Sequence, residues 1–187
     1  MIDAALTYVR DILNEHFRNE FSVSENKVVL SNIIKNNGEV APNLDGKIVF
    51  FLISLNEEPA LRNSMNRSAA IENGNTAVKP SALNLNLQVL FCSNFDSKVY
   101  IEGLSYLTSL VKFFKTNKII PIDLNNRKPG KLSFEMCNLS YDELSHLWSA
   151  IGSKLLPSVI YKVSMVVIND MPVRKVIPAI RETDGNG

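Results

Sequence analysis

The sequence predicts an α/β (α+β) fold, in which a single mixed β-sheet of about five to six strands is packed by three helices. Apolar residues recur at helical spacing in three stretches, alternate with polar residues in others, and are separated by turn residues. The expected helices are an N-terminal helix, a long middle helix and a short capped helix. A chain of 187 residues can bury one large core, so we expect a single domain over residues 1–168 and an extended C-terminal arm or tail over residues 169–187.

The N-terminal part of the chain predicts one amphipathic helix and two strands. Asn14 and several charged residues fall away from the apolar stripe of this helix, which comprises Ile2, Leu6, Val9, Leu13 and Phe17. A short β-branched segment from Lys27 to Ile34 predicts a strand. Residues 47–55 are apolar at both alternating positions, which is typical of a central strand covered on both sides.

The segment from Asn56 to Pro80 predicts a long loop, rich in asparagine and small residues, that carries Arg62 and Arg67. Connections of this length are uncommon in compact domains and are either functional or disordered. Both interpretations stay open from the sequence.

The middle of the chain predicts the clearest amphipathic strand and the longest helix after the first. Apolar residues alternate with mostly polar ones from Leu83 to Phe91, so we expect one buried and one polar face. A helix then runs from about Ser97 to Thr116, with Asp96 or Ser97 as its cap. Its apolar stripe is expected to comprise Tyr100, Leu104, Leu107, Val111 and Phe114.

The block from Leu132 to Ile168 predicts a strand, a capped helix and a second strand. Leu132, Phe134 and Met136 alternate with polar or small residues, as in a strand with one buried face. Ser140 and Glu143 form a capping box, and Gly152 can adopt the left-handed conformation that ends a helix. The apolar stripe of this helix comprises Tyr141, Leu144, Leu147, Trp148 and Ile151. After Pro157 the chain is extended again.

No residue pattern predicts catalysis, a cofactor or a metal site. His16 flanks the stripe of the first helix and His146 lies away from the stripe of the capped helix, and neither has a recognisable catalytic partner. The sequence has no phosphate-binding glycine motif. Cys92 and Cys137 lie among apolar strand residues, which indicates reduced, buried thiols rather than a disulfide.

Neither the net charge nor the hydrophobicity of the chain favours binding to nucleic acid or insertion into a membrane. The formal net charge is +1, and the longest apolar run, from Ile48 to Ile53, is far shorter than a membrane span. Asp3 stands where a secretory signal has a basic residue, so we expect synthesis in the cytoplasm.

Two segments carry a local positive charge. Between residues 112 and 131 Asp123 is the only acidic residue, whereas the basic residues are Lys112, Lys115, Lys118, Arg127, Lys128 and Lys131. A solvated face is the simplest interpretation, and the rim of a protein–protein interface explains the stretch at least as well as nucleic acid does. The tail mixes Arg174 and Lys175 with Val176 and Ile177, which indicates docking on its own domain or reaching a neighbouring subunit.

Read together, the N-terminal amphipathic helix, the run LNLNLQVLF (residues 83–91) and the run LSYDELSHLWSAIGSKLLPSVIYKV (residues 139–163) resemble the cap, or tail-terminator, proteins of contractile injection systems, which are phage-tail-like particles. The resemblance covers nearly the whole chain. Its most specific part is the spacing of Trp148, Gly152, Pro157, Ser158 and Tyr161, after the helix start at Ser140. These positions are expected to pack the core rather than to do chemistry.

The resemblance implies a structural protein without enzymatic activity or cofactor. It implies a homo-hexameric ring at the baseplate-distal end of the particle, which stops polymerisation and joins the outer sheath to the inner tube, with no nucleic-acid partner and no membrane insertion. The particle can be released from the cell. The alternative is a small α/β enzyme or ligand-binding domain with its site in the loop at residues 56–80. We expect the assembly contacts in segments that the core does not explain, and the candidates are Arg62, Arg67, Lys112, Lys115, Arg127, Lys128, Arg174, Lys175, Val176 and Ile177.

Overall fold

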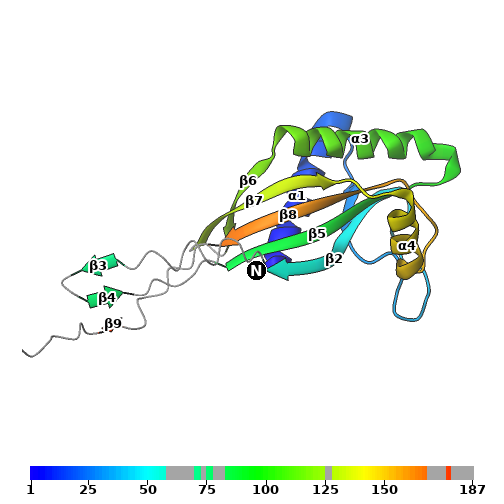
Figure 1. Cartoon of the computed structure of the whole chain (residues 1–187). Coiled ribbons are helices and arrows are strands. Elements are labelled where there is room, and N and C mark those ends of the chain that lie inside the picture. Colours follow the sequence, from blue (N-terminus) through cyan, green and yellow to red (C-terminus); the bar gives the residue numbers. More distant parts are fainter. Residues whose placement is uncertain (58–69, 73–74, 78–82, 125–127, 168–175, 178–187) are drawn as a thin grey trace, which may run out of the picture.

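The main body of the protein is one six-stranded mixed sheet, seen here in a computed structural model (Figure 1). The structure describes the whole chain except residues 58–69, 73–74, 78–82, 125–127, 168–175 and 178–187. The strand order is β1-β2-β5-β8-β7-β6, with β1 parallel to β2 and every other neighbouring pair antiparallel. The strands are β1 (Val28–Leu30), β2 (Lys47–Glu57), β5 (Leu83–Asn94), β6 (Ile119–Leu124), β7 (Lys128–Cys137) and β8 (Ser158–Val167). The predicted fold class is therefore confirmed.

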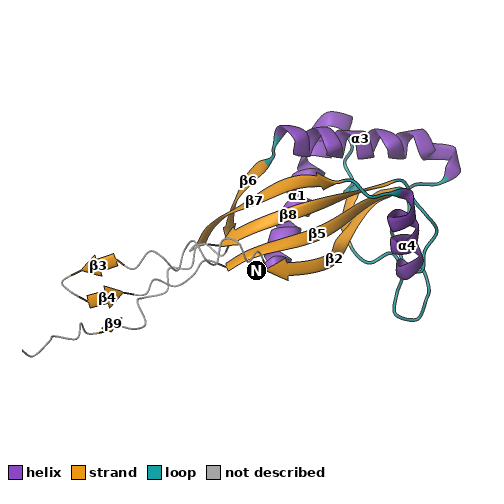
Figure 2. Ribbon diagram, in the orientation of Figure 1, coloured by secondary structure: helices purple, strands orange, loops and turns teal. Residues whose placement is uncertain are grey.

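Helices cover both faces of this sheet (Figure 2). One face packs against α1 (Ile2–Phe21) and α3 (Tyr100–Thr116), and a short 3₁₀ turn, η1 (Ser97–Val99), leads into α3. The opposite face packs against α4 (Tyr141–Ile151). Asp96 begins the middle helical segment, because its side chain accepts a hydrogen bond from the backbone N–H of Lys98.

The core has two parts because β2 and β5 are buried on both sides. Ile48 and Phe50 of β2 face the larger part, under α1 and α3, where the rings of Phe50 and Phe91 stack with centroids 4.9 Å apart. Val49 and Phe51 face the smaller part, under α4. The prediction of a central strand covered on both sides is confirmed for β2. For β5, the face expected to be mostly polar also contributes to the core at its C-terminal end, where Leu90 and Cys92 pack in the smaller part.

The predicted stripe of α3 is rotated relative to the face that the helix buries. Tyr100 is 46% exposed, and the buried residues are Gly103, Tyr106, Ser109, Leu110 and Phe114. The close approach of α3 to the end of β5 decides this, because a Cβ at Gly103 would lie 2.5 Å from Ser93 Oγ. Tyr106 also faces α1, with its ring 5.0 Å from that of Phe17.

Three further expectations are wrong in detail. The strand predicted from Lys27 to Ile34 forms only over Val28–Leu30, followed by an isolated bridge between Ile34 and Val40. Met136 is 44% exposed at the end of β7, and Tyr141 is 76% exposed in the first turn of α4. The helix α4 itself, its capping box and its left-handed end at Gly152 (φ 77°) are as predicted.

A second sheet forms where the sequence analysis predicts only a loop and a tail. Its three strands are β3 (Ala70–Glu72), β4 (Asn75–Ala77) and β9 (Val176–Ile177), in the order β3-β4-β9. All neighbours are antiparallel, with Glu72 opposite Asn75 and Thr76 opposite Ile177. The segment from Asn56 to Pro80 is therefore not a plain loop, and part of the tail pairs with it.

Candidate interaction surfaces

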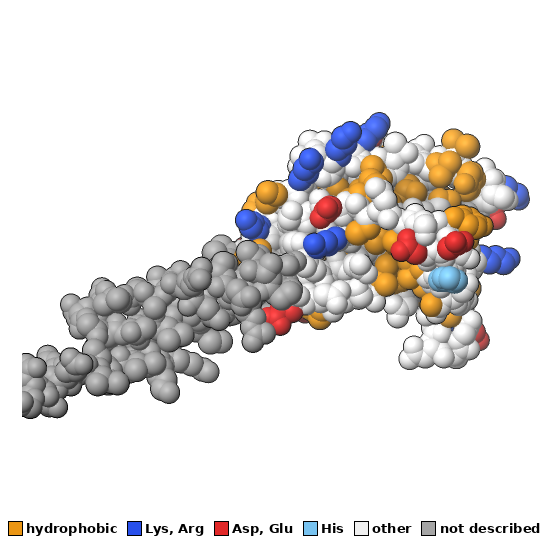
Figure 3. All heavy atoms as spheres, in the orientation of Figure 1, with side chains coloured by type: hydrophobic (Ala, Val, Ile, Leu, Met, Phe, Trp, Pro, Cys, Tyr) orange, Lys and Arg blue, Asp and Glu red, His pale blue; other side chains and the backbone are white. Residues whose placement is uncertain are grey.

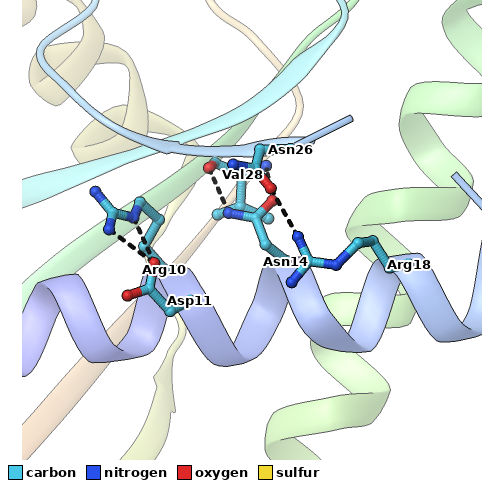
Figure 4. Close-up of polar contacts among 6 residues, drawn as sticks. All are labelled: Arg10, Asp11, Asn14, Arg18, Asn26 and Val28. Atoms are coloured by element: carbon cyan, nitrogen blue, oxygen red, sulfur yellow. Dashed lines mark hydrogen bonds and ion pairs between the residues drawn. The ribbon is translucent and has the colours of Figure 1, made fainter. Parts of the chain in front are cut away.

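At one edge of the six-stranded sheet, the side chain of a helix residue pairs with the backbone of the edge strand. Ile48 N–H donates to Lys27 O, and Ser31 N–H donates to Phe50 O, so Lys27 and Ser31 face β2 and the backbone of Val28 faces away from it. Asn14 of α1 pairs with that backbone (Figure 4): its amide nitrogen donates to Val28 O and its amide oxygen accepts from Val28 N–H, both at 2.9 Å. The amide thus substitutes for a neighbouring strand.

Asn14 is the residue that the sequence analysis missed at this edge. It is only 3% exposed, whereas the helical pattern places it away from the apolar stripe. Its neighbours on α1 behave as surface residues, since Arg10 pairs with Asp11 and Arg18 donates to the side chain of Asn26 (Figure 4). A buried polar side chain is satisfied by a partner from another element, and the sequence does not show that partner.

The other edge of the main sheet is interrupted by a proline. Phe134 N–H donates to Lys118 O at 2.9 Å, so residues 118, 120 and 122 bond to β7, and the backbone of Pro121 faces outward. Proline has no N–H to offer an added strand, and such residues protect exposed sheet edges. The sequence analysis did not predict β6. Asn14 thus pairs with one edge at Val28 and Pro121 interrupts the other, whereas β1 pairs with β2 only over Ile48–Phe50. Both the faces of the main body and the rest of the β2 edge are therefore candidates for contacts.

The candidate contacts Lys112 and Lys115 are exposed residues of α3. Figure 3 shows basic side chains gathered over this helix. Lys118, just beyond the helix, is also exposed. Lys131 does not join them, because side chains alternate along a strand and its neighbour Leu132 faces the core under α3.

A groove of about 330 Å³ lies between α3 and strands β7 and β8; we call it the α3–β7 groove. Aromatic side chains that are almost fully buried line it, namely Phe114, Phe134 and Tyr161. Burial raises the pKa of Tyr161 to about 12, so this phenol is neutral at physiological pH. The remaining lining residues are Val111, Met136, Lys115, Lys118 and Glu135.

The residues of the resembling block serve the core and the helix ends. Ser140 N–H donates to Glu143 Oε2 at 2.8 Å, and Glu143 N–H donates to Ser140 Oγ at 3.3 Å. The backbone N–H and the hydroxyl of Ser140 hold the pKa of Glu143 below its usual value. Trp148 of α4 is 2% exposed and packs in the smaller core between this helix and the sheet, and Pro157 O accepts a hydrogen bond from Ser93 N–H. Tyr161 belongs to the larger core on the opposite face of the sheet.

His16 takes part in a contact between α1 and α3 that lacks the geometry of a nucleophilic triad. Its Nε2 lies 2.9 Å from both Ser109 Oγ and Glu20 Oε2, and the Ser109 hydroxyl also donates to Glu20. In a nucleophilic triad the carboxylate binds the ring nitrogen opposite the one that faces the nucleophile. Here both partners meet the same nitrogen, so the cluster ties the helices together. His146 is exposed.

Several candidate contacts cannot be placed on a surface. Arg62, Arg67, Arg127, Arg174 and Lys175 lie outside the described residues. For Lys128 in β7, and for Val176 and Ile177 in β9, the structure describes the strand but not the side chain. The structure therefore places Lys115 at the α3–β7 groove and Lys112 on the same helix outside its lining, and leaves the other candidates untested. Within the described ranges no group of three or more His, Cys, Asp or Glu side chains is placed to hold a metal ion.

Comparisons with known proteins point to one family. The family model described as "Pvc16 N-terminal domain" matches residues 4–182. A comparison with curated proteins finds no match.

Two solved structures cover nearly all of this chain. One is the sheath/tube terminator, in its extended state, of the extracellular contractile injection system PVC. It is 16% identical, with a TM-score of 0.51, over 94% of this chain and 64% of the solved chain. The other is the anti-feeding prophage cap (AFP tube terminating cap), 14% identical with a TM-score of 0.49, over 96% of this chain and 60% of the solved chain. The protein thus shares the fold of the PVC terminator and spans less than two thirds of either solved chain's length.

Proposed function

Because this chain belongs to the Pvc16 N-terminal domain family, we propose that it is a structural cap, or tail-terminator, subunit of a contractile injection system. The family match over residues 4–182 carries the proposal, and it agrees with the resemblance found in the sequence. The fold shared with a sheath/tube terminator adds support. The role is binding rather than turnover.

We propose further that the subunits form a homo-hexameric ring at the baseplate-distal end of the particle, where the ring ends polymerisation and joins the sheath to the inner tube. A ring needs two different surfaces on each copy, one meeting the other on the next copy. The candidate surfaces are the faces of the main sheet, Lys115 at the α3–β7 groove with Lys112 on the same helix, and the segments that the core does not explain. The remaining candidates are Arg62 and Arg67 in the segment from Asn56 to Pro80, Arg127 and Lys128 in the basic stretch, and Arg174, Lys175, Val176 and Ile177 in the arm at residues 169–187.

The proposed route of assembly begins in the cytoplasm, where the chain is synthesised and joins a particle that can later leave the cell. Among the described residues, no helix has the length and apolar character needed to cross a bilayer. Neither a cofactor nor nucleic acid is required for this role.

Deletion of the gene tests the proposal directly. We expect particles made without the protein to have tubes of irregular length, or sheaths detached from tubes, when they are imaged by electron microscopy. The native mass of the purified protein, measured alone and with isolated tubes, tests the ring. Normal-length, intact sheathed tubes in the absence of the protein, together with a stable monomer that binds no tube, would refute the proposed function.

A further inference from the structure

The basic side chains beside the α3–β7 groove have no acidic partner in the described part of the chain. Lys112 and Lys115 of α3, and Lys118 just beyond its end, are exposed and close together in sequence. None of them forms an ion pair with a described residue. Cations near a helix C-terminus gain some energy from the helix dipole, which accounts for part of this placement. The dipole does not account for the apolar groove that two of these lysines line.

The groove itself offers apolar surface to a partner. The exposed part of that surface is mainly Met136, which is 44% exposed, while the rings of Phe114, Phe134 and Tyr161 lie almost fully buried beneath it. Methionine is flexible and polarisable, which suits it to accommodate a side chain of another molecule. An apolar centre with a charged rim is the usual anatomy of a protein-binding site, in which the centre supplies affinity and the rim supplies selectivity.

The same surface is poorly suited to nucleic acid. Single-stranded nucleic acid is bound by aromatic rings that are free to stack with bases. Phe114 is 1% exposed and Tyr161 is 3% exposed, so neither ring offers a free face.

We propose that the α3–β7 groove binds an extended acidic segment of a partner protein, with an apolar side chain of that segment seated between Phe134 and Met136. Its carboxylates pair with Lys115 and Lys118 at the rim, and Lys112 extends the positive field along α3. The inference rests on the proposed function only for the source of the segment, which is then a protein at the end of the particle.

The test uses a fluorescein-labelled peptide of Glu and Asp with a central Leu-Phe pair, about ten residues long so that it crosses the groove in extended form. We expect binding by fluorescence anisotropy that weakens as salt rises. The double variant Lys115→Glu, Lys118→Glu is expected to raise Kd about tenfold or more. A peptide with Ser-Ser in place of Leu-Phe is expected to bind about tenfold more weakly, since it loses the apolar anchor.

The matched control is Lys98→Glu with Lys154→Glu, which makes the same change in net charge at exposed lysines away from the groove. This control is expected to bind the peptide within about twofold of the wild type, and thermal unfolding checks that both variants are folded.

Four outcomes would overturn the inference: no binding of the acidic peptide, equal loss in the control variant, indifference to the Leu-Phe pair, or tighter groove-dependent binding of an oligonucleotide. If the protein binds isolated tubes or sheaths while the peptide fails, the inference falls and the proposed function stands.

Discussion

Replacing Asn14 with alanine tests whether one buried amide holds β1 in the sheet. Both backbone groups of Val28 are paired by Asn14 at 2.9 Å, and Val28 is 1% exposed. The variant leaves a buried N–H and a buried C=O without partners, and each costs about 1–3 kcal/mol. The higher helix propensity of alanine offsets about 0.5 kcal/mol of this loss in the free energy of unfolding. We therefore expect the free energy of unfolding to fall by about 2–5 kcal/mol.

Urea unfolding, followed by circular dichroism and by the fluorescence of the single tryptophan, measures this change. The matched control is Asn19→Ala, which removes the same side chain from an exposed position on the same helix and is expected to stay within about 0.5 kcal/mol of the wild type. Asn14→Asp retains the acceptor but sets a carboxylate oxygen against Val28 O, so we expect a loss at least as large as that of alanine. An Asn14→Ala protein as stable as the Asn19→Ala control would refute the reasoning.

Three other predictions concern the core and a helix end. Trp148→Ala is expected to lower the free energy of unfolding by about 3–5 kcal/mol, because it leaves a cavity where the buried indole ring of α4 packs against the sheet. Denaturant unfolding measures this change. Ser140→Ala removes the capping box and is expected to cost about 1 kcal/mol in the same assay. Burial raises the pKa of Cys92 and of Tyr161 to about 12, so above about pH 9 the folded chain retains protons that the unfolded chain loses. We therefore expect the free energy of unfolding to fall as pH rises from about 9 to 12. The expected loss is up to about 1.4 kcal/mol per pH unit for each group.

Each of these predictions has a control. Trp148 Nε1 has no hydrogen-bond partner among the described residues, so Trp148→Phe is expected to cost clearly less than alanine; an equal cost would show that the ring does not fill the site. A folded Trp148→Ala chain that fails to assemble would make Trp148 an interface residue. The control for Ser140→Ala is Asp142→Ala, because Asp142 is in the same helical turn but takes no part in the capping box. An equal loss of stability in this variant would contradict the capping argument. Tyr161→Phe is expected to flatten the loss of stability between about pH 10 and 12.

The stretches that the sequence predicts well are those in which neighbours along the chain decide the structure. The apolar spacing of α1 predicts the face that it buries, since Leu6, Val9, Leu13 and Phe17 all lie in the core. The capping box of α4 forms within four residues and needs nothing from the rest of the fold. The segment interpreted as a loop also contains a local hairpin signal that the interpretation did not use. This signal is the dipeptide Asn73-Gly74, which favours a two-residue hairpin turn.

The candidate site, too, is predicted from the sequence only where neighbours along the chain decide it. The excess of lysines from residue 112 onward is visible in the sequence, and so is the amphipathic character of the helix that carries the first of them. The groove beside them is not visible, because its walls come from residues 111–118, 134–136 and 161, which are distant in sequence and meet only when β7 and β8 pair beneath α3. Lys131 shows the converse, since it is close to this group in sequence but faces the other side of the sheet.

By itself the sequence determined the fold class, the extents of the three helices to within a few residues, and a family resemblance that the family match confirms. Only the tertiary structure decided which side of α3 is buried, why Gly103 is needed there, and that Asn14 pairs with a sheet edge. The physical reason is that periodicity and capping depend on contacts within a few residues, whereas burial of a glycine or an amide depends on the element packed against it.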